Sequence, residues 1–155
     1  MSTKHRSNSD LQVKIEKTQI KELEKLLNCS DLSNDAFIYF KGDDSSRIKP
    51  DIYSEKHHII GEVYTHLGKL KPSQIHKVTS DILKLILFNE DSGSNFEMYY
   101  VVCDQVAKES MLKNSVIRNA VRLYKIHVEC IPLSESMQDK LKETMRKQDL
   151  TKGQS

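Results

Sequence analysis

The sequence lacks any long apolar segment. No run among its 155 residues approaches the roughly 18 apolar residues that suggest a membrane span, so no membrane contact is expected. Residues 1–10 are polar and lack the apolar core of a secretory signal, which makes export unexpected. We therefore expect a cytoplasmic protein.

Cysteine is scarce, and its spacing does not suggest a metal site. The three cysteines, Cys29, Cys103 and Cys130, are widely separated and lie in or beside apolar segments. There is no CxxC pair of the kind that binds zinc. This usage is typical of reduced core thiols in a cytosolic protein. The sequence also has no internal repeats and no low-complexity tract.

The excess of charge of either sign is small, because the formal net charge is only +2. A polyanion partner is therefore not indicated by total charge, and the distribution matters more. From Lys108 to Lys125 the chain has five basic residues and one acidic residue. This segment is either a basic binding face or a solvated helix face. The basic residues are Lys108, Lys113, Arg118, Arg122 and Lys125.

Apolar periodicity and turn residues predict an alternation of helices and strands. Helices are expected over 11–27, 72–88, 106–123 and 134–146, and strands over 36–41, 48–53, 59–66, 98–103 and 124–131. This order predicts the α/β class: a central mixed sheet flanked by helices, in a single domain. The domain is expected to cover residues 11–148, with 1–10 and 149–155 disordered.

The most informative segment is the predicted hairpin from Lys49 to His66. If its turn is centred on Lys56 and His57, facing residues have numbers that sum to 113, so Asp51 faces Glu62. Directly opposed side chains have Cβ atoms about 4.5–5.5 Å apart, close enough for two carboxylates to hold one divalent cation. Alternation along the strand places Ile60, Glu62, Tyr64 and His66 on one face.

These residues also resemble a known motif. Pro50-Asp51, a gap of ten residues, and Gly61-Glu62-Val63-Tyr64-Thr65 are similar to the PD and E-x-K elements of the PD-(D/E)XK nuclease superfamily, with Tyr64 in place of the lysine. The resemblance covers residues 11–131 in element order and about 25 residues in motif.

The resemblance implies a restriction-endonuclease-like fold that hydrolyses DNA or RNA, with Asp51 and Glu62 as ligands of Mg²⁺ or Mn²⁺. In this superfamily the following helix can supply the basic residue, which makes Lys77 the first candidate and Gln74 a supporting polar group. Small nucleases of this architecture often pair, so a homodimer or larger complex is included among the expected partners. Further lysine candidates are Lys49, Lys69 and Lys71. The polar stripe of the helix consists of Gln74, Lys77, Asp81 and Lys84.

Other interpretations stay open. Asp51 and Glu62 could be edge residues that discourage strand aggregation. His57 and His58 are expected to be solvent-exposed, whereas His66 shares the Glu62 face and is a candidate ligand or proton carrier. The functional alternatives are a catalytically inactive nuclease-fold protein that binds nucleic acid or a protein partner, which the missing lysine favours, and a small regulatory protein that shares only the architecture.

Overall fold

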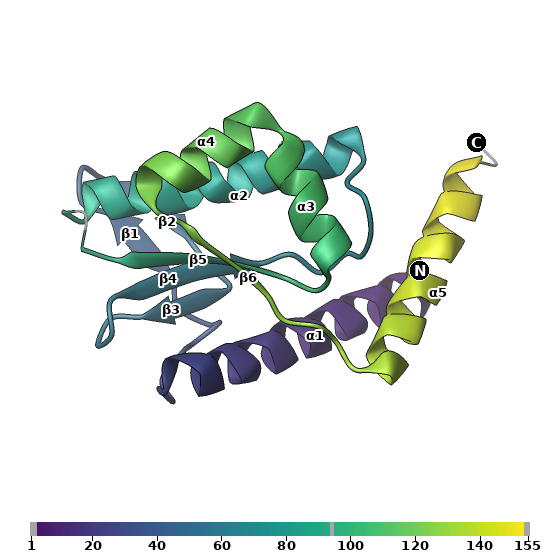
Figure 1. The fold of residues 1–155 in the computed structure, drawn as a ribbon. Coiled ribbons are helices and arrows are strands. Elements are labelled where there is room, and N and C mark those ends of the chain that lie inside the picture. The colour runs from purple at the N-terminus through teal and green to yellow at the C-terminus, as the bar shows by residue number, and fades with distance from the viewer. Residues whose placement is uncertain (1–2, 94, 154–155) are drawn as a thin grey trace.

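The chain folds around a mixed β-sheet with helices on both faces (Figure 1). The computed structural model describes the backbone of residues 3–93 and 95–153 and the side chains of residues 10–93 and 95–150. The elements are α1 (Thr3–Leu27), β1 (Ile38–Phe40), β2 (Asp43–Ile48), β3 (Ile52–Ser54), β4 (Ile59–Val63), α2 (Pro72–Asp91), β5 (Glu97–Val102), α3 (Gln105–Lys113), α4 (Ser115–Tyr124), β6 (His127–Cys130) and α5 (Glu135–Gly153).

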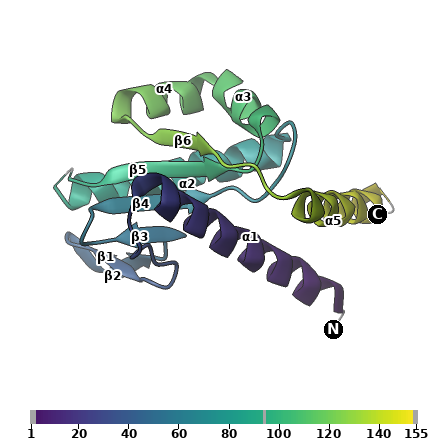
Figure 2. The ribbon, with the colours of Figure 1, turned by 60° about the horizontal axis from the view of Figure 1, so that its bottom comes forward.

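The sheet has the strand order β3-β4-β5-β6. β3 is antiparallel to β4, and β4, β5 and β6 are mutually parallel neighbours. The parallel pairs require crossover connections, which α2 provides between β4 and β5 and α3 with α4 provides between β5 and β6. A separate antiparallel hairpin, β1–β2, lies beyond β3, at the opposite end of the row of strands from β6 (Figure 2). The mixed α/β class expected from the sequence is confirmed.

The predicted register of the β3–β4 hairpin is also confirmed. Ile52 pairs with Gly61 and Ser54 pairs with Ile59, so facing numbers sum to 113 as expected. The polar Glu55–His58 segment makes the turn, and His58 has a left-handed φ of 54°. Asp51 is the residue directly before β3, next to Ile52, and is therefore carried to the end of β4 that holds Glu62.

Alternation along the strands divides the core into layers. On the side of α2 and α4, Ile60 and Tyr100 pack with Val78, Ile82 and Leu85 of α2. The burial of these α2 residues confirms the predicted apolar face of that helix. On the other side of the sheet, α1 contributes apolar residues that pack against the strands (Figure 1). The residues of this second layer are Ile20, Leu23, Ile52, Ile59, Val63, Tyr99, Val101 and Ile131.

Several elements differ from those expected. Residues 43–47, which separate the predicted strands 36–41 and 48–53, lie in strand β2. The single helix predicted over 106–123 is two helices, because Asn114 caps a new helix by accepting hydrogen bonds from Val116 N and Ile117 N. Both terminal helices extend beyond the boundaries 11–148 given above for the domain. No helix in the described part of the chain is both long and apolar enough to cross a membrane.

Candidate functional site

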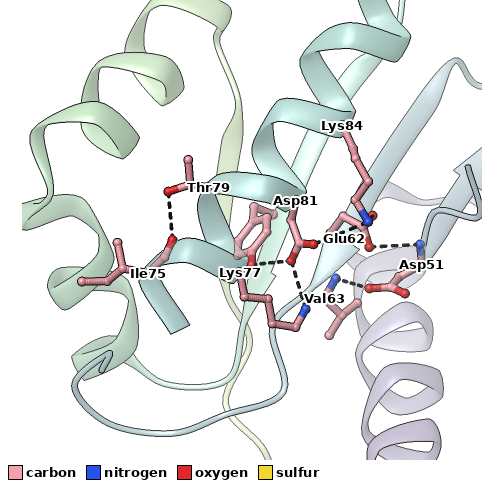
Figure 3. A network of polar contacts seen from close by, with 9 residues as sticks. Asp51, Glu62, Val63, Ile75, Lys77, Thr79, Asp81 and Lys84 are labelled. Atoms are coloured by element: carbon pink, nitrogen blue, oxygen red, sulfur yellow. Dashed lines mark hydrogen bonds and ion pairs between the residues drawn. The ribbon is translucent and has the colours of Figure 1, made fainter. Parts of the chain in front are cut away.

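Two carboxylates meet at the open end of the β3–β4 hairpin. Val63 N donates a hydrogen bond to Asp51 Oδ2 at 2.9 Å, and Asp51 N approaches Glu62 Oε2 at 3.4 Å (Figure 3). Pro50 is buried beside Asp51, and Glu62 is only 4% exposed. The two acids predicted from the sequence therefore lie at the same end of the hairpin, with Glu62 bonded to the backbone of Asp51 and Asp51 bonded to the backbone of Val63.

The local fold of β4 dictates where Glu62 points. Alternation places Ile60, Glu62 and Tyr64 toward α2, whereas Gly61 and Val63 face the α1 side. Gly61 is required for the strands to approach, because a Cβ there would lie 2.6 Å from the carbonyl oxygen of Tyr99. Glu62 is thus held on the buried helical face by a closely packed strand pair.

Helix α2 places a line of charged residues over Glu62. Lys77, Asp81 and Lys84 are spaced by four and three residues, so they lie on one face of the helix. Lys84 Nζ is 3.4 Å from Glu62 Oε1 and 3.6 Å from Asp81 Oδ1, and Lys77 Nζ is 3.2 Å from Asp81 Oδ2. Buried Tyr100 donates its hydroxyl to Asp81 Oδ2 at 3.0 Å. The carboxylates and lysines form one network (Figure 3).

Burial controls the protonation of this network. Desolvation, a side-chain hydrogen bond with Asp51 and the charge of Asp51 raise the pKa of Glu62 to about 9, although Lys84 acts in the opposite direction. Burial disfavours the charged form of Lys84, but the charges of Glu62 and Asp81 outweigh that effect and raise its pKa. The raised pKa of Glu62 favours its protonated form at neutral pH, and the raised pKa of Lys84 favours its charged form.

Glu16 of α1 lies near the acidic pair but is not among the site residues predicted from the sequence. Burial and the charge of Asp51 raise the pKa of Glu16 to about 7, while Lys77 and Lys49 act to lower it. Glu16 is therefore a half-buried acid in the same electrostatic neighbourhood as Asp51. The available signal was that Glu16 lies four residues before Ile20 and seven before Leu23, so an acid occupies the helical stripe that packs on the sheet.

Tyr64, which stands at the lysine position of the motif, cannot replace a cation. Its side chain is completely buried, and its hydroxyl has no hydrogen-bond partner among the described residues. Burial raises the pKa of Tyr64, so it stays neutral at physiological pH. The positive charge beside Glu62 comes from Lys84 of α2.

The other residues predicted from the sequence have partners other than Glu62. Gln74 Oε1 accepts a hydrogen bond from Lys71 N at 2.8 Å, so its amide oxygen is engaged at the start of α2. Lys71 pairs with Asp149 of α5. Lys77, the first choice above, contacts Asp81 and not Glu62. His57 pairs with Asp31, and the ring of His66 packs 5.4 Å from that of Tyr64.

No protein-family model, curated protein or solved structure matches the chain.

The carboxylates of Asp51 and Glu62 could share a proton, or they could bind a hard cation together with a substrate. No group of three or more His, Cys, Asp or Glu side chains forms a ready metal cage in the part of the chain that the structure describes. Mg²⁺ does not need one, because it commonly binds through one or two carboxylates together with water and phosphate oxygens. Asp51 and Glu62 are the two carboxylates that could hold it, and a cation between them would offset the burial and the repulsion that raise the pKa of Glu62.

Proposed function

We propose that this chain is a metal-dependent nuclease of the PD-(D/E)XK type, with a restriction-endonuclease-like fold, that hydrolyses phosphodiester bonds of DNA or RNA. The observation that carries the proposal is the 3.4 Å contact between Lys84 Nζ and Glu62. This contact supports the idea that α2 supplies the positive charge missing from position 64. Lys84 thus takes the place first assigned to Lys77.

Asp51 and Glu62 would hold Mg²⁺ or Mn²⁺ in this reaction. A bound cation would act as a Lewis acid and lower the pKa of a coordinated water. Glu62 would have to give up its proton to act as a ligand, so cation binding should strengthen as the pH rises toward 9. The Lys84 ammonium, which contacts Glu62, would stabilise negative charge that develops on the phosphoryl oxygens.

The hydrolysis itself is a simple displacement. The oxygen of water bonds to phosphorus while the bond from phosphorus to the leaving sugar oxygen breaks. The attacking water loses a proton, and the leaving oxygen gains one. Glu16, whose pKa of about 7 lets it exchange a proton near neutral pH, is a candidate to accept the proton of the water.

The test is cleavage of single-stranded and duplex DNA and RNA by the purified chain with Mg²⁺ or Mn²⁺, compared with the same reaction in chelator. Glu62→Gln and Asp51→Asn should each lower the rate at least 100-fold, because each removes a cation ligand. Lys84→Gln should lower kcat more than it raises KM, and Lys77→Gln should have a smaller effect. Asp31→Asn changes an acid of the loop before β1 that contacts the turn of the same hairpin. It is the matched control and should cleave normally.

Cleavage that survives Glu62→Gln would contradict the proposal, since the activity would then come from another site or another protein. The alternative, an inactive nuclease-fold subunit, is favoured by one observation, the buried neutral Tyr64. It predicts salt-sensitive binding of nucleic acid without cleavage under any metal condition. The basic side chains of α3 and α4 would contribute to such binding, but Arg118 is already bonded to the carbonyl oxygens of Leu112 and Lys113.

A further inference from the structure

The β1–β2 hairpin carries exposed aromatic rings that the core does not explain. Its inner side chains, Ile38, Phe40 and Ile48, pack against the main core. The alternate side chains point outward, so that Phe37 is 51% and Tyr39 is 53% exposed. Large aromatic side chains are usually buried more completely than this, and two of them two residues apart form a short row of rings.

Two cations share this outer face. Arg47 pairs with Tyr39 across the hairpin, and its Cζ lies 4.2 Å from the centroid of the Phe37 ring. Lys49 Nζ lies 5.6 Å from the same centroid. We call Phe37, Tyr39, Arg47 and Lys49 the hairpin face. The acids of β2, Asp43 and Asp44, lie at the turn, and Asp43 is engaged by Ser45 and Ser46.

The hairpin face leads directly to the acidic pair. Lys49 is two residues from Asp51, and its charge acts on Glu16 in the site. Arg47 is four residues from Asp51, so their Cα atoms are at most about 14 Å apart, given the reach of an extended chain. A strand held along Arg47 and Lys49 would therefore pass within about 14 Å of Asp51.

We propose that the hairpin face binds an unpaired segment of a nucleic-acid strand and leads it to the acidic pair. Bases stack on Phe37 and Tyr39, and phosphates contact Arg47 and Lys49, the combination used by proteins that bind single strands. Duplex bases are already stacked on their neighbours and cannot cover these rings without being extruded. This inference rests on the proposed function and narrows its substrate to strands with an unpaired region.

Binding is measured in chelator, where cleavage is off. The probes are a fluorescent single-stranded oligonucleotide of about 20 nucleotides, within the site sizes common for such proteins, and the duplex of the same sequence. The wild-type chain should bind the single strand at least ten-fold more tightly than the duplex. The double variant Phe37→Ala/Tyr39→Ala should lose at least ten-fold of this affinity and little of its affinity for duplex. Arg47→Gln should weaken binding and lower the slope of log affinity against log salt by about one.

Matched variants separate this role from simple surface effects. Tyr124→Ala removes a ring that is 42% exposed on α4 and should leave binding unchanged. Tyr39→Phe keeps the ring and should also bind normally. Circular dichroism of each variant checks the fold, which removal of exposed rings should not disturb. In the cleavage assay, Phe37→Ala/Tyr39→Ala should raise KM for single strands and leave kcat nearly unchanged.

The outcomes distinguish the two proposals. If the double variant binds the single strand as tightly as wild type, the hairpin face is overturned, whether or not the protein cleaves. Equal loss of duplex and single-strand affinity overturns the preference for unpaired strands. If the wild type never cleaves but its binding depends on Phe37 and Tyr39, the nuclease proposal fails and the hairpin face stands.

Discussion

The carboxylates at the two ends of the β3–β4 hairpin have pKa values that are shifted in opposite directions. At the open end, burial and the charge of Asp51 raise the pKa of Glu62 to about 9. At the turn, Asp31 accepts a hydrogen bond from Ser54 Oγ at 2.6 Å and lies 2.7 Å from His57 Nδ1. The hydrogen bond from Ser54 and the nearby His57 lower the pKa of Asp31.

The two carboxylates therefore affect the stability of the folded chain in opposite directions. Asp31 has donors that favour its charged form, so it supports the loop before the sheet. Glu62 is held against another acid with one lysine in reach, an arrangement that costs stability until a cation or proton is added. Perturbed acids of this kind mark functional sites more often than structural ones.

The largest expected effect comes from adding a carboxylate to the core with no partner at all. Ile82→Asp should unfold the domain, because Ile82 is only 3% exposed and an unpaired buried carboxylate costs several kcal/mol against a total stability of roughly 5–15 kcal/mol. Asp81, one residue earlier, is tolerated because Tyr100, Lys77 and Lys84 contact it. Leu83→Asp, at a position 54% exposed, is the control and should stay folded by circular dichroism.

The next effect is a gain of stability that depends on pH. Glu62→Gln should raise the Tm of the chelator-treated protein, because it mimics the protonated acid. The folded pKa of about 9 exceeds the ordinary 4.5, so the wild type loses stability as the pH rises between these values. At pH 7 the gain should approach about 3 kcal/mol, an upper estimate worth several degrees in Tm. Thermal melts should show little difference near pH 4, and a gap that is constant from pH 5 to 9 would contradict this assignment.

A smaller loss should follow from widening the strand pair that both ends share. Gly61→Ala should destabilise the domain by about 1–3 kcal/mol, as other overpacking changes do. The added Cβ would lie 2.6 Å from the carbonyl oxygen of Tyr99. Because this oxygen belongs to the backbone of β5, the clash can be relieved only if β4 moves away from β5. Gly42→Ala is the matched control, because its nearest neighbour would be a side-chain oxygen at 3.7 Å. Urea unfolding that fails to separate the two variants would show that the strands tolerate the shift.

The smallest effect is expected at the turn, with the opposite dependence on pH. Asp31→Asn should lower the Tm slightly at neutral pH, because the lowered pKa of Asp31 means that its charged form is stabilised by folding. This contribution is present above the unfolded pKa and disappears as the pH falls through the folded value. The gap between wild type and variant should therefore close in acid. Asp35→Asn, in the same loop, should melt like the wild type at each pH.

The sequence predicts the β3–β4 hairpin well because its information is local. The length of the polar turn and the alternation of apolar residues together specify the register that brings Asp51 to Glu62. Strand β2 is harder to predict from the sequence, because Asp43–Ile48 has the sequence DDSSRI, with few apolar or β-branched residues. Its pairing with β1 and the burial of Ile48 make it a strand.

The choice of lysine could not be made from local pattern. Periodicity correctly groups Lys77, Asp81 and Lys84 on one helical face, but Lys77 and Lys84 are about 10 Å apart along the axis. Which of them reaches Glu62 depends on how far the connection from β4 carries the start of α2. Glu16 poses the same problem, because its approach to Asp51 depends on the docking of α1 from far along the sequence.

Helix α2 also sets the distance between two of its contacts. Its last residue, Asp91, accepts hydrogen bonds from Lys41 N and Gly42 N at the tip of the β1–β2 hairpin, whereas Lys84 contacts Glu62. Seven residues of helix separate Lys84 from Asp91, a rigid span of about 10 Å. The helix thus holds the tip of the β1–β2 hairpin at a constant distance from the contact between Lys84 and Glu62. A change in the length of α2 between these two contacts would break one of them.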